Sequence, residues 1–275
     1  MSAGSSKSVD PDDSYTAANR AAWDAIADRR QKIFPPAGHF AEGGSVLDKR
    51  DHEAAGDVRG LRLCHLQCGS GEEALSWANL GAEVTGVDIS PRQIELATAK
   101  AKAAGIAADF VAADVCSLPH DLLRPASFDI VYTGGGALVW LPSLDRWAAT
   151  INDLLKPSGR LIVREEHPVI ARVEVREGAI AIVNDYFDRQ PEASTGWCHF
   201  PGAADAPETK WDWTWPLGDI ITSVAQAGLR VERLTEFPST AAWRFGDDLE
   251  RLQKLPGSYL FVASKPPDTD QQASA

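Results

Sequence analysis

The chain alternates between strand-like and helix-like segments from about residue 60 to residue 166, and this alternation most constrains its fold. Apolar runs such as LRLCHLQ, EVTGVD and SFDIVYT are separated by segments whose apolar residues recur with helical spacing. The helix predicted after EVTGVD has strong end signals: Ser90 as N-cap, Pro91 in the first turn, Gln93 in a capping box and Gly105 at its end. Strands alternating with helices are predicted to run parallel and to be joined by right-handed crossovers.

The predicted fold class is therefore α/β, with a doubly wound and mostly parallel sheet. The strand-like runs ADFVAAD and GRLIVREE bring the number of strands before residue 167 to five. After residue 216 the pattern resumes with the helix LGDIITSVAQAG and the strands LRVERLTEF and GSYLFVASK. Seven strands are expected in total.

The domain boundaries follow from where this pattern begins and stops. Both ends of the chain are polar, and apolar residues recur at helical spacing from about Tyr15 to Arg30. The 49 residues after the fifth strand interrupt the pattern with a hairpin expected around Glu177 and Gly178 and a segment rich in Trp and Pro. The predicted divisions are a disordered N-terminus at 1–14, a helix and connection at 15–59, the main domain at 60–265 with an insertion at 168–216, and a disordered tail at 266–275.

Charge and composition exclude several classes of protein. The chain has 27 basic and 39 acidic side chains, a net charge of −12, and nucleic-acid affinity depends largely on basic side chains, so binding of bulk duplex is not expected. It shows neither a leader peptide nor a membrane-spanning run, so a cytoplasmic protein without a membrane partner is predicted. The four cysteines lack the paired spacing of a structural zinc site, and no metal is predicted. The oligomeric state stays open.

The turn after the first strand reads HLQCGSGEEA and carries the clearest ligand-binding signal. Gly69, Gly71 and Ala74 fit the pattern G-x-G-x-x-G/A, in which glycines let the backbone approach a nucleotide-type ligand at a helix N-terminus. A merely tight turn is the alternative. Asp88 ends the second strand, where a carboxylate can accept hydrogen bonds from both hydroxyls of a ribose. Its alternative role as a helix cap is already filled by Ser90.

The succession LCHLQCGSGEEALSWA, VTGVDIS, FVAADV, FDIVYTGGG and LLKPSGRLIV resembles the class I S-adenosylmethionine-dependent methyltransferases of small molecules across residues 60 to 166. The resemblance implies a Rossmann-like fold whose last strand is antiparallel, and S-adenosylmethionine as cofactor. It assigns Asp88 to the ribose, Ile89 to packing beside the adenine, and Asp114 with Val115 to the adenine edge. A loop cap is the alternative for Asp114.

The chain departs from that family within the first turn. Family members commonly carry an acidic residue where His65 stands and a glycine where Gln67 stands. The missing acid removes a contact near the methionine ammonium, for which the Gln67 amide could compensate. Thr133 and Gly134 follow the fourth strand, where the resemblance places the methionine part of the cofactor.

The resemblance also implies that the N-terminal helix is a lid over the cofactor. Tyr15 and Trp23 are the candidates for covering its methionine half, although Trp23 could equally fill the core. The Trp-rich insertion is expected to form a second lid over a small apolar or aromatic substrate, with a partner-binding surface as the alternative.

His167 is the candidate general base, because it follows the fifth strand at the edge where open α/β sheets place functional groups. Glu165 is expected on the same side as a partner that raises its pKa. A histidine bonded only to the backbone is an equal alternative. His199, Tyr186 and Asp185 are weaker candidates.

These features together predict a methyltransferase that moves a methyl group to a small-molecule acceptor. The rival enzyme is a nicotinamide-dependent oxidoreductase, which the glycine turn and Asp88 also permit. A non-catalytic S-adenosylmethionine-binding protein is a third hypothesis, because His65 and Gln67 are unusual. The atom that is methylated is not determined by the sequence.

Overall fold

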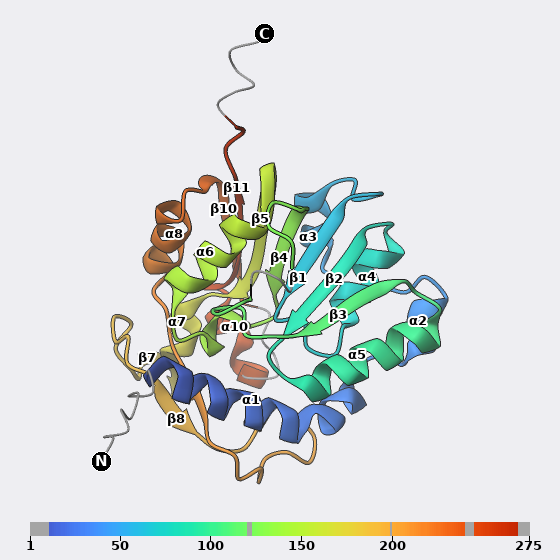
Figure 1. Ribbon diagram of the computed structural model, residues 1–275. Helices are drawn as coiled ribbons and strands as arrows, with labels where there is room; N and C mark the ends of the chain where they lie inside the picture. Colours follow the sequence, from blue (N-terminus) through green and yellow to red (C-terminus); the bar gives the residue numbers. More distant parts are fainter. Residues whose placement is uncertain (1–10, 120–122, 199, 240–244, 269–275) are drawn as a thin grey trace, which may run out of the picture.

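A computed structural model describes residues 11–119, 123–198, 200–239 and 245–268, and a single twisted sheet lies at its centre (Figure 1). The strand order is β10-β11-β5-β4-β1-β2-β3. β11 runs antiparallel to both of its neighbours, and the other six strands share one direction. The predicted doubly wound sheet of seven strands with an antiparallel last strand is therefore confirmed. The strands are β1 (Arg62–Leu66), β2 (Glu83–Asp88), β3 (Ala108–Ala112), β4 (Phe128–Gly134), β5 (Leu155–Glu166), β10 (Arg230–Pro238) and β11 (Pro256–Ser264).

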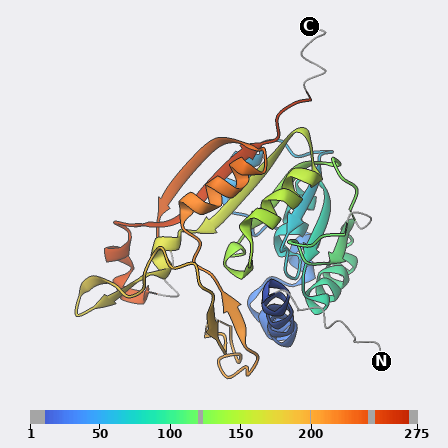
Figure 2. The same ribbon diagram turned by 60° about the vertical axis from the view of Figure 1, so that its left-hand side comes forward.

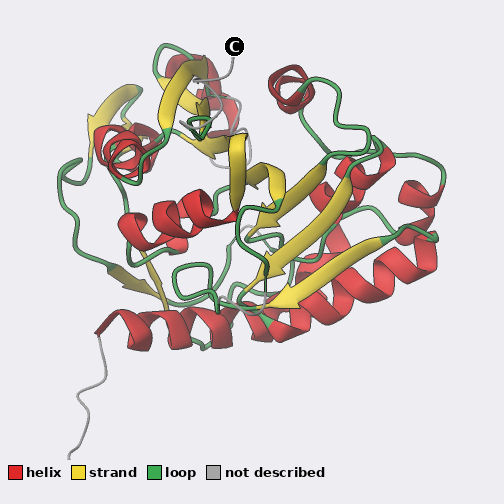
Figure 3. Ribbon diagram, turned by 45° about the horizontal axis from the view of Figure 1, so that its top comes forward, coloured by secondary structure: helices red, strands yellow, loops and turns green. Residues whose placement is uncertain are grey.

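Helices cover both faces of this sheet (Figure 3). Successive strand residues point to opposite faces, so Leu63 and Ile130 pack with Trp77 on one face. Leu66 and Val131 pack with Trp147 on the other. The helices of the first face are α3 (Lys49–Ala55), α4 (Glu72–Asn79) and α5 (Pro91–Ala104), and those of the second are α6 (Leu144–Leu154) and α8 (Leu217–Gln226).

The N-terminal helix α1 (Pro11–Arg30) crosses the edge of the sheet at which the parallel strands end (Figure 1). It begins before the predicted residue 15, so residues 11–14 are helical rather than disordered; residues 1–10 lie outside the described residues. At the other end, residues 266–268 are described without regular structure, and residues 269–275 are outside.

The connection between α1 and β1 is more ordered than predicted. It contains η1 (Gln31–Ile33), α2 (Ala37–Ala41) and α3. Asp48 caps α3, and a full capping box joins Asp48 to Asp51, so the predicted irregular connection contains a well-capped helix. In α5 the expected caps Ser90 and Gly105 are present, but Gln93 does not complete the box, because the Ser90 N–H donates to Asp88 instead.

The insertion after β5 forms two small hairpins, and the second of them, which pairs residues 192–194 with 210–212, lies next to α1 (Figure 2). The first turns at Glu177 and Gly178, as predicted; both have positive φ. Among the described residues, no helix combines the length and the apolar character needed to span a bilayer. The remaining elements are η2 (Leu138–Trp140), α7 (Pro168–Ala171), β6 (Val173–Arg176), β7 (Ala179–Ile182), β8 (Glu192–Ser194), β9 (Lys210–Asp212), η3 (Gly246–Asp248) and α10 (Leu249–Leu252).

Candidate cofactor and acceptor site

A cavity of about 250 Å³ lies where β1, β2 and β4 end, under α1. Parallel strands that end at one edge of a sheet leave a crevice between the loops that follow them, and ligands of α/β proteins bind there. The cavity brings together eight of the predicted site residues, which are Trp23, Gln67, Gly69, Asp88, Ile89, Asp114, Val115 and Gly134. Tyr15, Gly71, Thr133 and His167 do not line it.

The first turn is built from left-handed backbone. Gly69 has φ 53° and Gly71 has φ 85°, conformations that favour glycine. A Cβ on Gly71 would lie 3.0 Å from both Ala97 Cβ and Phe110 Cζ, so Gly71 lets α4 approach the sheet rather than lining the cavity. Gln67 has φ 57° where family members commonly have glycine. Its side chain offsets this strain by donating from Nε2 to the Ala137 carbonyl at 2.7 Å.

Asp88 is held by one backbone N–H of the first turn and by one of the turn that follows it. Its Oδ2 accepts from the Gly69 N–H at 2.8 Å, and its Oδ1 accepts from the Ser90 N–H at 2.9 Å. Burial raises the pKa of Asp88, and these two bonds oppose that shift. Each carboxylate oxygen has a second lone pair. The carboxylate is thus fixed at the cavity wall with acceptor capacity left for a pair of hydroxyls.

Asp114 and Val115 follow β3 and also line the cavity, and the preceding residue, Ala113, donates its N–H to the Asp88 carbonyl at 2.9 Å. Asp114 accepts from the Cys116 N–H at 2.8 Å, so it does cap its own loop, and burial raises its pKa. On β4, strand alternation sends Thr133 into the core on the α6 side, and only Gly134 reaches the cavity. The prediction that Thr133 lines the site is not supported.

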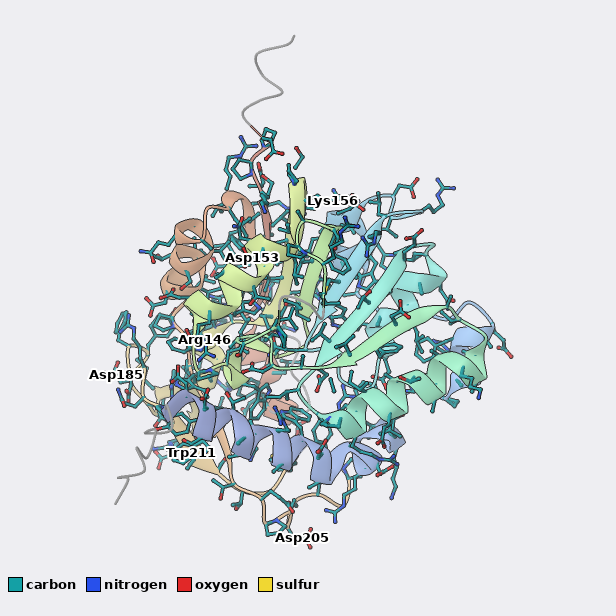
Figure 4. All side chains as sticks on the ribbon, in the orientation of Figure 1. Arg146, Asp153, Lys156, Asp185, Asp205 and Trp211 are labelled. Atoms are coloured by element: carbon teal, nitrogen blue, oxygen red, sulfur yellow. The ribbon has the colours of Figure 1, made fainter. Side chains whose placement is uncertain are left out.

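Helix α1, the predicted lid, contributes one face to the cavity. Thr16, Asn19, Trp23 and Arg30 line it, spaced by three, four and seven residues along α1. Tyr15 is turned away from this face, and its ring packs against Trp211 and Trp213 at 4.8 and 5.5 Å between centroids; Figure 4 labels Trp211 beside α1.

The lid also meets the loop after β4 and the insertion. The Trp23 ring lies edge-on to Trp140 at 5.3 Å and close to Trp197 at 4.5 Å, so Trp23 covers the cavity and packs in a small core at once. Trp197 is fully buried in that core. No described residue of the insertion lines the cavity. Trp197 packs against Trp23, and Trp211 and Trp213 pack against Tyr15, so these three tryptophans hold α1 in place instead of forming a second lid.

His167 lies outside the cavity. Its Nδ1 accepts from the Val169 N–H and caps α7, and its Nε2 lies 2.9 Å from a Glu236 oxygen. Burial lowers the pKa of His167, which corrects the expected rise, and its partner is Glu236 rather than Glu165. Glu165 accepts from the backbone N–H groups of Ala137 and Leu138.

The weaker candidates also lie elsewhere. The Tyr186 hydroxyl accepts from the Leu217 N–H, and Asp185 caps its own turn at the edge of the molecule (Figure 4). His199 falls outside the described residues.

Several lining residues were missed, most notably Arg30, Glu72, Glu73, Gln93 and Trp140. The lid residues could have been found by extending the helical spacing from Trp23 in both directions. No local signal distinguishes Glu72 and Glu73 from ordinary first-turn acids of a helix.

Several residues that line the cavity carry buried polar atoms without a partner in the part of the chain that the structure describes. Oε1 of Gln67, both amide atoms of Gln93 and both ring nitrogens of His65 are buried and make no hydrogen bond among the described residues. Buried polar groups normally find partners. A nucleoside bearing an amino-acid chain offers donors and acceptors along its whole length, so the wall fits S-adenosylmethionine.

The comparisons with known proteins agree with this geometry. A family model described as "Methyltransferase domain" matches residues 64–163. The chain is 31% identical over 220 residues to a ubiquinone biosynthesis O-methyltransferase of Chelativorans sp., which covers 79% of this chain and 76% of that protein. It is 36% identical over 98 residues to a sterol 4-C-methyltransferase of Caenorhabditis elegans, covering 35% of this chain and 28% of that protein.

Among solved structures, an S-adenosylmethionine-dependent methyltransferase from Mesorhizobium loti has the same fold. Its TM-score is 0.59 at 23% identity, over 76% of this chain and 93% of that one. The chain spans about half or less of the length of the first curated relatives it matches. The match to the Chelativorans protein extends over more than two thirds of both chains, and with the fold and the glycine turn it places this chain in the class I S-adenosylmethionine-dependent methyltransferase family.

Proposed function

We propose that this protein transfers a methyl group from S-adenosylmethionine to a small, apolar or aromatic acceptor. The observation that carries the proposal is a single cavity that joins the ribose and adenine candidates, Asp88 and Asp114, to the glycines after β4. The relatives support a small acceptor, since those named above act in ubiquinone biosynthesis or on a sterol.

The residues at the ends of β2 and β3 would hold the adenosine. Asp88 accepts from the ribose hydroxyls, Ile89 packs beside the adenine, and Asp114 accepts from its amino group while the Val115 N–H donates to a ring nitrogen. When bound, the cofactor supplies an electrophilic methyl group on a sulfonium. What the protein adds is the position and orientation of the two reactants and the exclusion of water.

The acceptor would bind beside the loop after β4. Gly134, Gly135 and Gly136 leave this wall without side chains, while Trp23 and Trp140 provide flat apolar surfaces above it. Two side chains bind the backbone of Ala137 in this loop. Gln67 donates to its carbonyl, and Glu165 accepts from its N–H. The loop is thereby fixed, which favours a defined acceptor orientation.

Calorimetry with S-adenosylhomocysteine and with nicotinamide dinucleotides tests the cofactor. We expect binding of the former alone; binding of the nicotinamide dinucleotide alone would reject the proposal in favour of an oxidoreductase. Incubation with S-adenosylmethionine and a panel of phenols, quinols and small aromatic amines should then release S-adenosylhomocysteine with at least one acceptor. Tight cofactor binding without turnover on any pool of metabolites would point to a binding protein instead.

A further inference from the structure

We propose that Glu73 binds the ammonium group of the cofactor, in place of the acidic residue that family members commonly carry at the position of His65. This inference rests on the proposed function. It also distinguishes two neighbouring residues at the start of α4, both of which line the cavity. Glu72 belongs to a cluster of side chains with a net positive charge, and Glu73 to a cluster with a net negative charge.

Glu73 reaches the space next to His65 from a different element. His65 lies in β1 and points toward α4, and its Nε2 is 3.5 Å from Oε2 of Glu73. A Cβ on Gly135 would lie 4.0 Å from that same oxygen, so Oε2 faces the loop after β4. The Glu73 side chain is 19% exposed, and both residues line the cavity. The carboxylate that is missing at position 65 of β1 is thus supplied by Glu73 of α4.

With Glu73 and Asp51 ionised, the cluster around Glu73 has one negative charge in excess, and burial raises the pKa of both carboxyl groups. Arg164 donates to Oε1 of Glu73 at 2.6 Å and to both carboxylate oxygens of Asp51 at 2.8 and 2.9 Å. One guanidinium therefore serves two carboxylates. Burial, together with the nearby charge of Arg164, lowers the pKa of His65 to about 3, so His65 is neutral and cannot supply the second positive charge.

With Lys100 protonated, the cluster around Glu72 has one positive charge in excess; burial lowers the pKa of Lys100, and the charge of Glu72 opposes that shift. Glu72 is paired with both Arg30 and Lys100, and its carboxylate also accepts from the Ser70 hydroxyl at 2.7 Å. Burial acts to raise the pKa of Glu72, but the charges of Arg30 and Lys100 outweigh it and lower that pKa to about 2. Arg30 also lies beside Gly69, at 3.3 Å from the position of a Cβ there.

A ligand with an ammonium and a carboxylate on one carbon would balance both clusters at once. Its ammonium would offset the excess negative charge at Glu73, and its carboxylate the excess positive charge at Arg30. A buried charge is costly unless it is paired, so a zwitterion should be favoured over a neutral or singly charged chain. The amino-acid end of S-adenosylmethionine has this charge pattern.

The first test uses the unaltered protein and two ligands. S-adenosylhomocysteine is compared by calorimetry with the analogue in which hydrogen replaces its amino group. A hydrogen bond between charged groups corresponds to roughly a 10- to 100-fold difference in Kd, and we expect the analogue to bind more weakly by that factor. Equal affinities would overturn the ammonium contact, whereas absence of any S-adenosylhomocysteine binding would overturn the proposed function.

The second test assigns the contact to Glu73. Glu73→Gln should lose about 10- to 100-fold in affinity for S-adenosylhomocysteine while binding 5′-methylthioadenosine, which lacks the amino-acid end, like the unaltered protein. The latter ligand reports whether the adenosine site is still folded. Glu53→Gln, a neutralised surface carboxylate of α3, is the matched control and should bind both ligands normally.

A third variant tests whether Glu73 takes over the role of the acidic residue that family members carry at the position of His65. Adding His65→Asp to Glu73→Gln restores a carboxylate at the position where family members carry one and should recover at least part of the lost affinity for S-adenosylhomocysteine. If Glu73→Gln binds both ligands as tightly as the unaltered protein, the proposal is wrong. It is equally wrong if the loss is the same for 5′-methylthioadenosine, or if His65→Asp deepens it.

Discussion

Asn19 joins the lid helix to two other segments, and its removal should both destabilise the protein and loosen the cavity. The side chain is 2% exposed. Its Nδ2 donates to the carbonyls of Trp211 at 2.8 Å and Trp140 at 3.3 Å, and its Oδ1 accepts from the Trp211 N–H at 2.7 Å. One amide thus connects α1 to β9 and to η2, which forms part of the cavity wall.

The expected cost can be worked out from these three bonds. Each contributes a net ~1 kcal/mol, so Asn19→Ala loses about 3 kcal/mol. Alanine recovers roughly 0.5 kcal/mol through its higher helix propensity. A net loss of about 2.5 kcal/mol corresponds to a fall in Tm of roughly 5–10 °C for a domain of this size. Because Trp23 and Arg30 lie on the same helix, the affinity for S-adenosylhomocysteine should also fall, by several-fold or more.

Thermal unfolding and calorimetry measure the two effects separately. Asn79→Ala is the matched control, since the Asn79 amide also donates to two carbonyls, those of Phe40 and Gly44, but does not line the cavity. It should lower Tm and leave the affinity unchanged. If Asn19→Ala lowered Tm no more than an exposed substitution does, the three bonds would not hold the lid; if only Tm fell, the lid would not shape the cofactor site.

Three further predictions concern other parts of the site. Asp88→Asn should weaken S-adenosylhomocysteine binding by roughly 10- to 100-fold in calorimetry, because a charged acceptor for the ribose is lost; unchanged affinity would remove Asp88 from the ribose site. Burial raises the pKa of Glu165 to about 7. The folded protein then binds more protons than the unfolded one between about pH 4.5 and 7, so its free energy of unfolding should decrease as the pH rises through this window. Chemical denaturation should show a decrease about 3 kcal/mol larger than that of Glu165→Gln. Parallel pH profiles of the two proteins would contradict this. Gly71→Ala should lower Tm, since the alanine backbone would be held at a strained positive φ and its methyl group would crowd Phe110. An unchanged Tm in thermal unfolding would show that the turn can relax.

The sequence predicted the sheet and much of the cofactor end of the cavity, because both depend on local patterns. Apolar periodicity marks strands and helices, and the carboxyl ends of parallel strands share one edge. Gly69, Asp88 and Asp114 lie at or shortly after the ends of three different strands, and the topology alone brings them to one crevice.

Errors arose where a side chain's direction depends on its surroundings. Tyr15 and Trp23 are both aromatic residues of α1, but only the rotation of the helix against the sheet decides that Trp23 enters the cavity. His167 stands at the correct edge of the sheet, yet its ring turns to cap α7 and to meet Glu236 on β10.

The sequence by itself determined the fold class, the glycine turn and the acidic residues Asp88 and Asp114 at the ends of two strands. These features depend on local patterns of residues that are close together in the chain. The tertiary structure decided which charges meet across the cavity. Glu73, Arg164 and Asp51 come from three elements, and their association depends on the packing of α3 and α4 on β5. Electrostatic pairing acts over a few ångströms of space, irrespective of distance along the chain, so only the folded protein shows it.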